Sequence, residues 1–388
     1  MDRPVFKYAC CVLAVTILTA STLFAQSGDK GQGGLNVINT AVPFLTIAPD
    51  ARGGGMGDVG AATTPDVFSQ HWNPAKYAFI ESPAGFAFSY TPWLSQLVDD
   101  INLFYAAGFW RPDDLQAFSM SIRYFSLGRV VLRQHADDHS NLVANPNEFA
   151  IDFAYSRKLS ERFSASVAFR YIRGDLNVPM LPGQEGIEMN PAHAVAADIS
   201  AFYTTPITMA AGDANLAFGA NISNIGNKVT FDESTFNFLP TNLRLGTSFD
   251  MPIDAFNRIS FNADANKLLV ISRNGRFAGS EFNDVTVLQS IFNSFTDDAT
   301  FRQQMQRIMW SVGVEYSYNN QFFVRAGYFH EHFNQGGRQY FTAGAGFRLN
   351  VFQLDAGYII SRTAANPLNN TLRFSLSFDI DGLRDLMN

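Results

Sequence analysis

From Gly85 onward, apolar and polar residues alternate in short segments, which is the pattern of β-strands with two different faces. In the segment 116–126, Phe118, Met120 and Tyr124 share one face, while small or polar residues share the other. Fourteen segments alternate in this way, and the longer ones have roughly the 9–11 residues that a tilted membrane strand needs. They cover residues 85–91, 100–110, 116–126, 147–157, 162–173, 193–204, 214–224, 241–250, 257–267, 310–318, 321–330, 339–348, 351–360 and 370–379.

The second face of these strands is mostly Ser, Gly, Ala and Asn, with about one charged residue per strand. A soluble β-sandwich also alternates, but its polar face meets water and would carry many Lys and Glu. Small residues with sparse charges of both signs favour a crowded barrel lumen, where we expect the charges to form structural ion pairs. The charges are Arg123, Asp152, Arg170, Asp198, Arg244, Asp264, Glu315, Arg325, Arg348, Asp355 and Arg373.

Composition supports a membrane protein. The 388 residues include 37 Phe, and only 16% are charged, whereas about a quarter of the residues of a soluble domain are charged. After the N-terminal segment, no apolar run approaches the ~18 residues of a spanning helix. We therefore predict an all-β fold, a 14-stranded antiparallel transmembrane β-barrel over residues 85–379. Aromatic residues near strand ends fit interfacial girdles: Tyr90, Trp110, Tyr155, Tyr171, Tyr318 and Tyr358.

Residues 1–25 have the layout of a secretory signal peptide, with Arg3 and Lys7 before an apolar run and small residues at its end. We expect cleavage after Ala25. Both cysteines, Cys10 and Cys11, would leave with the signal, so the mature chain would have no disulfide, thiolate metal site or cysteine nucleophile.

Residues 26–84 show neither a helical period nor strand alternation. Their centre is rich in glycine, which allows positive φ angles and close backbone approach, and Asn73 precedes a proline that favours an extended or turn conformation. Such a segment is suited to burial inside another structure. The residues that we single out are Gly53, Gly54, Gly55, Met56, Gly57, Asn73, Pro74 and Ala75.

Connections between the predicted strands alternate in length. The turns 111–115, 157–161, 319–320 and 349–350 are short, and the loops 126–146, 174–191, 225–240 and 268–309 are long. In such barrels short turns face the periplasm and long loops face the exterior, so the segment 26–84 is predicted to start on the periplasmic side. Residues 380–388 would form a short periplasmic tail.

The longest loop, 268–309, contains two stretches with a helical period. The first gathers Val287, Leu288, Ile291, Phe292 and Phe295 on one face, and the second gathers Phe301, Met305, Ile308 and Met309. These helices either cap the barrel mouth or form an apolar grip for a partner. For the second alternative, the candidate binding residues are Leu288, Ile291, Phe292, Phe295, Phe301 and Met305, and changing Phe292 and Phe295 to Asp should weaken binding.

Catalytic and cofactor motifs are largely missing, so we expect no enzyme, no cofactor and no metal site. The cluster His330-Glu331-His332 offers two imidazoles but no evident third ligand. One loop places Ser140 beside His135, His139, Asp137 and Asp138, which leaves a lipid hydrolase as a remote alternative to a solvated loop tip. The net charge of −7 argues against nucleic acid as a partner.

The motif GGGMGD followed by NPA ahead of a barrel resembles the FadL family of outer-membrane proteins. That resemblance implies that residues 26–84 form a hatch in the lumen, and we expect Asn73 to fix the hatch to the wall and keep the pore shut. The longer stretches PFLTIAPDARGGGMGD, SQHWNPAKYAF, FVRAGYFHEH, YFTAGAGFRLNVFQLDAGY and NPLNNTLRFSLSFD resemble the PorV (LptO) family of type IX secretion proteins.

The second resemblance implies an outer-membrane shuttle. Such a protein would associate with the SprA/Sov translocon barrel, bind the C-terminal signal domain of cargo, and deliver the cargo to the sortase-like PorU with PorQ and PorZ. There the signal would be removed and lipopolysaccharide attached, so the chemistry would occur on a partner. The alternatives are a FadL-type channel for long-chain fatty acids or other hydrophobic solutes and, more remotely, a lipid A or lipopolysaccharide deacylase.

Overall fold

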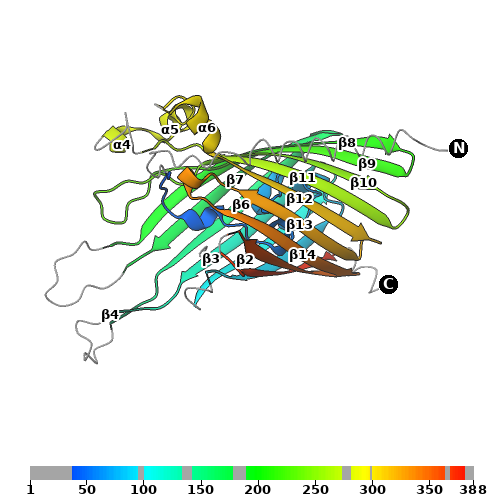
Figure 1. The fold of residues 1–388 in the computed structure, drawn as a ribbon, viewed down its shortest axis with the longest axis horizontal. Helices are drawn as coiled ribbons and strands as arrows, with labels where there is room; N and C mark the ends of the chain where they lie inside the picture. The colour runs from blue at the N-terminus through cyan, green and yellow to red at the C-terminus, as the bar shows by residue number, and fades with distance from the viewer. Residues whose placement is uncertain are drawn as a thin grey trace. The chain divides into compact units, whose positions relative to one another are not determined.

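The computed structural model describes residues 37–94, 100–132, 142–177, 189–272, 281–297, 299–362 and 368–380. Fourteen strands form one closed antiparallel barrel, in which each strand pairs with its neighbours along the chain and the first pairs with the last (Figure 1). The strands are β1 (Ala84–Pro92), β2 (Ile101–Asp113), β3 (Gln116–Leu127), β6 (Asn147–Ser160), β7 (Phe163–Asp175), β8 (Ala192–Met209), β9 (Gly212–Gly226), β10 (Asn242–Pro252), β11 (Asn257–Leu268), β12 (Ile308–Tyr318), β13 (Phe322–His330), β14 (Gln339–Leu349), β15 (Phe352–Ser361) and β16 (Leu372–Asp379). The predicted fold class and strand number are confirmed.

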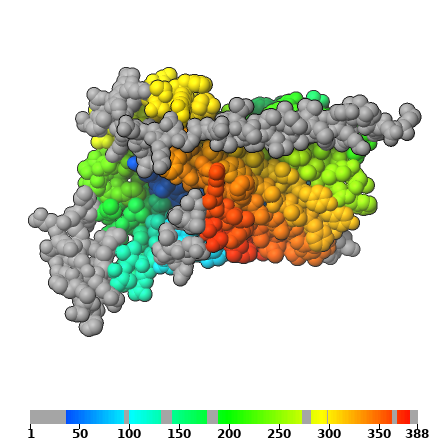
Figure 2. Space-filling view, in the orientation of Figure 1, coloured from blue at the N-terminus to red at the C-terminus, as the bar shows by residue number. Residues whose placement is uncertain are grey.

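The two faces of the strands lie as the alternation predicts. Outward side chains are large, apolar and exposed, as for Phe88, Phe169 and Val324, while inward side chains such as Ser119 and Asp152 are buried. Figure 2 shows the outward surface over the strands coloured orange to red. The proposed girdle residues all lie on the outward face, and Tyr and Trp side chains of this kind suit a membrane interface.

Most strand boundaries fall within a few residues of the prediction, but β8 is longer and includes Pro206. The pairing of β7 with β8 begins at Phe163 and Tyr203, so residues beyond Thr204 have only β9 as a ladder partner. A proline is tolerated there because its missing N–H group can face the open side. The prediction that the strand ends at residue 204 was therefore wrong.

The barrel has one end with short turns and one end with long loops, which we call the long-loop end. Two features of the long loops escaped prediction: the hairpin of β4 (Val130–Leu132) and β5 (Leu142–Ala144), and the helix α4 (Glu281–Asp284). The helices α5 (Val287–Asn293) and α6 (Phe301–Gln306) confirm the predicted helical pieces, but Ile308 and Met309 belong to β12 rather than to a helix face. Among the described residues, no helix has the length and apolarity required to cross a membrane.

Residues 37–83, which we call the lumen segment, lie against the inward side chains of the barrel. The segment contains η1 (Pro43–Thr46), α2 (Ala51–Gly55), α3 (Ser69–Trp72) and η2 (Pro74–Phe79). Its first part lies at the long-loop end, where Ala41 N donates to Phe238 O, and its last residues lie near the short turns, where Arg111 N donates to Pro83 O. The prediction of a periplasmic start depends on residues 26–36, which lie outside the described part of the chain.

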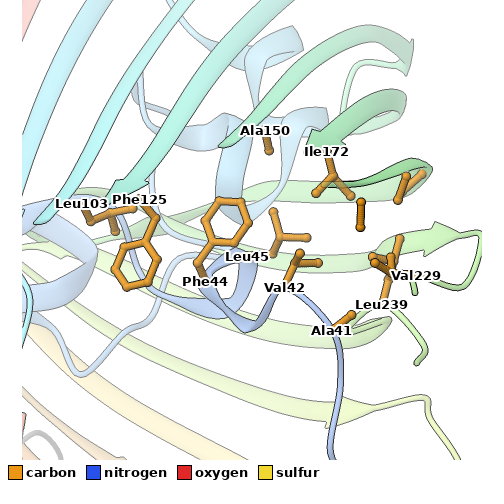
Figure 3. Packing of buried hydrophobic residues seen from close by; sticks show 13 residues of the cluster. Ala41, Val42, Phe44, Leu45, Leu103, Phe125, Ala150, Ile172, Val229 and Leu239 are labelled. Atoms are coloured by element: carbon orange, nitrogen blue, oxygen red, sulfur yellow. The ribbon is translucent and has the colours of Figure 1, made fainter. Parts of the chain in front are cut away.

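A hydrophobic cluster joins the start of the lumen segment to the wall (Figure 3). Phe44 stacks on Phe125 with ring centroids 6.1 Å apart, and Val42 and Leu45 belong to the same buried cluster as Ile172. Burial of side chains of this size contributes about 1.5–3 kcal/mol each. The lumen segment is therefore part of the core of the barrel.

Candidate functional site

Two of the four elements of the lumen segment, α2 and η2, begin with a side-chain cap. Asp50 caps α2 by accepting a hydrogen bond from Gly53 N at 2.7 Å, and its other oxygen accepts one from Trp72 Nε1 at 2.6 Å. Asn73 caps η2 by accepting from Ala75 N, and Pro74 occupies the first helical position, where a missing N–H group costs nothing. These contacts hold the two elements together across the lumen.

The glycines of the lumen segment allow its backbone to approach the barrel closely. Gly55 lies against Gly344, where an added Cβ would be 3.1 Å from the Gly344 Cα. Gly57 has a φ of +77°, and its Cβ would be 2.7 Å from Tyr328 N. Gly54 lies against the Arg373 side chain of the barrel, Gly53 lies against the Trp72 side chain of the segment itself, and Met56 is fully buried.

The barrel wall also contributes glycines to these close contacts. On six strands an inward glycine has no room for a Cβ, which would lie between 1.9 and 3.2 Å from an atom of residues 51–61. These glycines are Gly219, Gly246, Gly313, Gly327, Gly344 and Gly357. Glycine inside a strand often marks the close approach of another backbone, so these inward glycines are the sequence signal of the contact.

The predicted residues Asn73, Pro74 and Ala75 also contact the wall. Asn73 Nδ2 donates to Ala201 O of β8 and to Ala61 O of the lumen segment, each at 2.9 Å. Pro74 O accepts from Ser156 Oγ at 2.8 Å, and Ala75 O accepts from Ser164 Oγ at 2.7 Å. All eight residues singled out from the sequence are thus buried, and all except Gly53, whose close neighbours Trp72 and Val59 belong to the segment, contact the barrel.

Buried ion pairs form a second set of contacts. Nine of the eleven charges predicted to form lumen ion pairs do so: Asp152 and Asp198 with Arg170, Asp264 with Arg244, Glu315 and Asp355 with Arg325, and Arg373 with a residue of the segment. The other two behave differently, because Arg123 donates to backbone carbonyls of Phe44 and Leu45, and Arg348 donates to Gln353.

The segment supplies partners that the sequence did not reveal. Arg52 pairs with Glu315 at 2.8 Å and with Asp66, and Asp58 accepts from Arg373 at 2.6 Å and from Tyr340 at 2.7 Å. Charged residues within a run of small buried residues were the available signal. Removing one partner of such a pair leaves a buried charge uncompensated.

At the long-loop end, α5 and α6 present an apolar surface. Both helices begin with a capping box, formed by Thr286 with Gln289 and by Thr300 with Gln303. Phe292 is 70% exposed and Phe301 is 82% exposed, and Ile291 is partly buried. The other predicted binding residues, Leu288, Phe295 and Met305, are also exposed. The yellow segment that carries them projects at this end of the barrel (Figure 2).

The same helices rest on the barrel through polar groups. Lys267 Nζ at the end of β11 donates to Ser294 O at 3.2 Å and to Gln304 Oε1 at 2.9 Å, and Ser290 Oγ accepts from Ile271 N. Ser290 and Ser294 are buried. One apolar residue of α5, Val287, also packs against the cluster formed by Phe238, Ile271 and other residues, so the helices contact the barrel through both polar and apolar groups.

The other candidate chemistry is dispersed or lies outside the described residues. His330 stacks on Trp310, Glu331 pairs with Arg338, and His332 caps a short 3₁₀ turn, η4 (Phe333–Gln335). Within the described ranges, no group of three or more metal-ligating side chains comes together. The loop with His135, Asp137, Asp138, His139 and Ser140, the signal peptide and the tail 381–388 lie in the undescribed parts of the chain.

Comparison with known proteins adds the family. The chain is similar to a deltaS2S3 mutant of the TodX monoaromatic hydrocarbon channel, at 10% identity, with 85% of this chain and 98% of that chain covered and a TM-score of 0.51. It is similar to the P. putida toluene transporter TodX, at 8% identity, with 86% and 98% covered and a TM-score of 0.50. A Pseudomonas aeruginosa FadL homologue matches at 12% identity, 89% and 100% coverage, and a TM-score of 0.45.

The similarity to the two TodX structures is a similarity of fold alone. Comparison with curated protein sequences gives no match. The model of one protein family, described as "Type IX secretion system protein PorV", matches residues 30–274, which is more than half of the chain. This chain belongs to the PorV family of type IX secretion system proteins.

Proposed function

We propose that this barrel is a surface carrier, which binds the C-terminal signal domain of secreted cargo leaving the translocon and passes it to the complex that attaches it to the cell surface. The coarser role, an outer-membrane protein of the type IX secretion system, is that of its family. The observation that carries the finer proposal is the apolar surface of α5 and α6.

That surface has the character of a docking site. The helices lie beyond the barrel wall, where contiguous apolar side chains are exposed to water. Exposure of such a patch to water is unfavourable, and patches of this kind mark interaction sites. Phe292 and Phe301 are aromatic, and aromatic side chains are enriched at the centres of protein interfaces. The polar contacts of Lys267 with Ser294 and Gln304 hold both helices in place, so the surface is preorganised.

The packing of the lumen favours a protein that binds partners at its surface over a channel for solutes. A channel for hydrophobic solutes would need the lumen segment to move, and the backbone contacts at Gly219, Gly313 and Gly327 oppose such movement. The proposal therefore places the folded partners at the surface of the barrel and not in a passage through it: the SprA/Sov translocon, the cargo signal domain, and the attachment components PorU, PorQ and PorZ with lipopolysaccharide.

The experiment is cargo capture by the purified full-length protein. Phe292→Asp with Phe301→Asp should weaken binding of a cargo signal domain about tenfold or more, because two charges replace the most exposed aromatic side chains of α5 and α6. Phe295 is left unchanged because its ring lies under the Lys267 ammonium, 5.2 Å from the ring centroid. The control, Asn283→Asp with Thr296→Asp, adds the same two charges at exposed polar positions of the same loop.

Binding that is equal for the aromatic variant and the control would contradict the assignment of this surface.

A deletion strain distinguishes the carrier function from that of a solute channel. Cargo retained in the periplasm with normal uptake of labelled fatty acid supports the carrier, whereas normal surface cargo with lost uptake supports a solute channel.

A further inference from the structure

The lumen contains a cavity of about 310 Å³ between the lumen segment and the long-loop end of the wall. His71 and Trp72 of the lumen segment line one side of the cavity, and Trp93, Met309 and Leu368 line the side toward the long loops. Asp58, which also lines the cavity, directly follows Met56 and Gly57, and these two residues pack against Gly327 of the wall. The size of the cavity is at the lower end of the range for small-ligand sites.

The cavity lining contains more arginines than acidic residues, although acidic side chains pair with most of these arginines. Four arginines and two acidic residues line the cavity. Arg170, Arg307 and Arg338 each make an ion pair of 3.0 Å or less with Asp198, Asp297 and Glu331. The other acidic residue is Asp58, whose oxygens accept from Arg373 and Tyr340.

Of the four arginines that line the cavity, Arg244 makes the longest polar contacts with acceptors of the protein. Its two hydrogen bonds to described residues, with Asp58 O and Asp264 Oδ2, are each 3.5 Å long. Asp264 Oδ2 also accepts from Gly60 N and Ala61 N, so much of its charge is already compensated. The Arg244 guanidinium lies 4.6 Å from the Trp72 ring centroid, which orients it for a planar anion.

Amide groups lie beside this arginine. Asn242 is two residues from Arg244 on the inward face of β10, and its Nδ2 donates to Asn266 Oδ1 of β11 at 3.2 Å. Asn242 Oδ1 is buried and has no hydrogen-bond partner among the described residues, and neither has His71 Nε2. Buried polar atoms of this kind carry a cost unless a ligand satisfies them. Side-chain amides match the donors and acceptors of a peptide backbone.

Residues that line the cavity are close in sequence to the proposed docking surface. Arg307 and Met309, which line it, directly follow α6, and Leu268 follows the Lys267 that holds α5 and α6. A domain docked on the helices would therefore have a nearby pocket for a chain end.

We propose that this cavity binds the free carboxyl terminus of an extended peptide, with Arg244 holding the terminal carboxylate and the Asn242–Asn266 amides pairing with peptide backbone groups. The inference rests on the proposed carrier function and names the part of the cargo that enters the barrel. Apolar side chains next to the terminus would contact Trp93 and Met309. A fatty acid also carries a carboxylate, but it offers no backbone groups to the amide pair.

The test uses the full-length barrel in detergent and one cargo signal domain prepared with either a carboxylate or an amide at its C-terminus. The wild type should bind the carboxylate form about tenfold or more tightly, since a hydrogen bond to a charged group supplies that difference. Arg244→Gln should remove the preference, with both forms binding like the amide form. The control, Arg258→Gln, removes an arginine paired with Asp250 near the short turns and should keep the preference.

A second variant separates a binding role from misfolding. Asn242→Leu keeps Arg244, so it should weaken both forms of the domain while the preference for the carboxylate remains. Faster migration of the unheated barrel than of the heat-unfolded chain on electrophoresis shows that each variant is folded. Equal binding of the two forms by the wild type would overturn this inference and leave the carrier function standing, whereas absence of binding for both forms would refute the carrier function itself. Oleate is the probe for an acyl ligand. If oleate binds in a way that depends on Arg244 and is not displaced by the carboxylate form of the domain, the inference of a peptide terminus is overturned in favour of an acyl ligand.

Discussion

Gly327→Ala is the sharpest test of the contact between the lumen segment and the wall. The new Cβ on β13 would lie 2.1 Å from the carbonyl carbon of Met56 and 2.3 Å from Gly57 N, whereas ordinary contacts are 3.4–4 Å. Both neighbours are backbone atoms, so no side-chain rotation relieves the overlap. The segment or the strand must move by about 1 Å, a displacement that close-packed interiors resist.

The energetic cost follows from two contributions. Overpacking of a filled interior costs about 1–3 kcal/mol. The displacement also lengthens the hydrogen bond from Gly57 N to Thr342 Oγ1, now 2.8 Å, and that from Thr342 Oγ1 to Gly55 O, now 2.9 Å, each contributing about 1 kcal/mol. We expect Gly327→Ala to lower the free energy of unfolding by about 2–4 kcal/mol.

The assay is equilibrium unfolding by urea in phospholipid vesicles, followed by tryptophan fluorescence. The matched control is Gly108→Ala on the outward face of β2, where a Cβ would meet no atom closer than 3.4 Å. That substitution should change stability by no more than about 0.5 kcal/mol. Equal stability of Gly327→Ala and wild type, or an equal loss in Gly108→Ala, would refute the reasoning that the close glycine contacts hold the segment.

Two further predictions concern the polar contacts of the segment. Asn73→Ala removes the donor to Ala61 O and Ala201 O, so it should cost about 1–3 kcal/mol in the same assay and increase conductance in planar bilayers; lasting large pores from the wild type would contradict the closed state. Glu315→Gln leaves Arg52 and Arg325 without their shared anion and should cost about 3–5 kcal/mol. Added salt should not change that loss, because screening acts mainly on exposed charges, and a loss that depends on ionic strength would place this pair in bulk water.

The barrel was predictable because alternation encodes the two faces of each strand directly. Phe88 and Phe169 fall on the outward face and Arg123 and Asp152 on the inward face, as their positions in the pattern require. The count of strands follows from the same pattern. Strand ends were less certain because pairing, not composition, sets them, and Pro206 remains within β8 for that reason.

The lumen contacts were only partly predictable. The glycine-rich motif marks residues 53–57 as a place of close backbone approach, but it does not say which strands they approach. Arg52 and Asp58 pair with Glu315 and Arg373, which are more than 250 residues away in sequence, so no local pattern reveals the pairs. The helices at the long-loop end were predicted from periodicity, whereas the direction of their apolar faces depends on the polar contacts of Lys267.

The distribution of these contacts bears on where the protein can change shape. The lumen segment touches the wall through backbone packing, buried ion pairs and hydrogen bonds on many strands, so displacing it would break several costly contacts together. The helices α5 and α6, in contrast, are joined to the barrel by fewer contacts, the polar ones around Lys267 and the packing of Val287, and they carry exposed apolar side chains. Regions with few buried contacts have the lowest local stability. If the protein binds and releases cargo as we propose, the accompanying changes are expected at the long-loop end, while the lumen segment stays in place beneath the cavity.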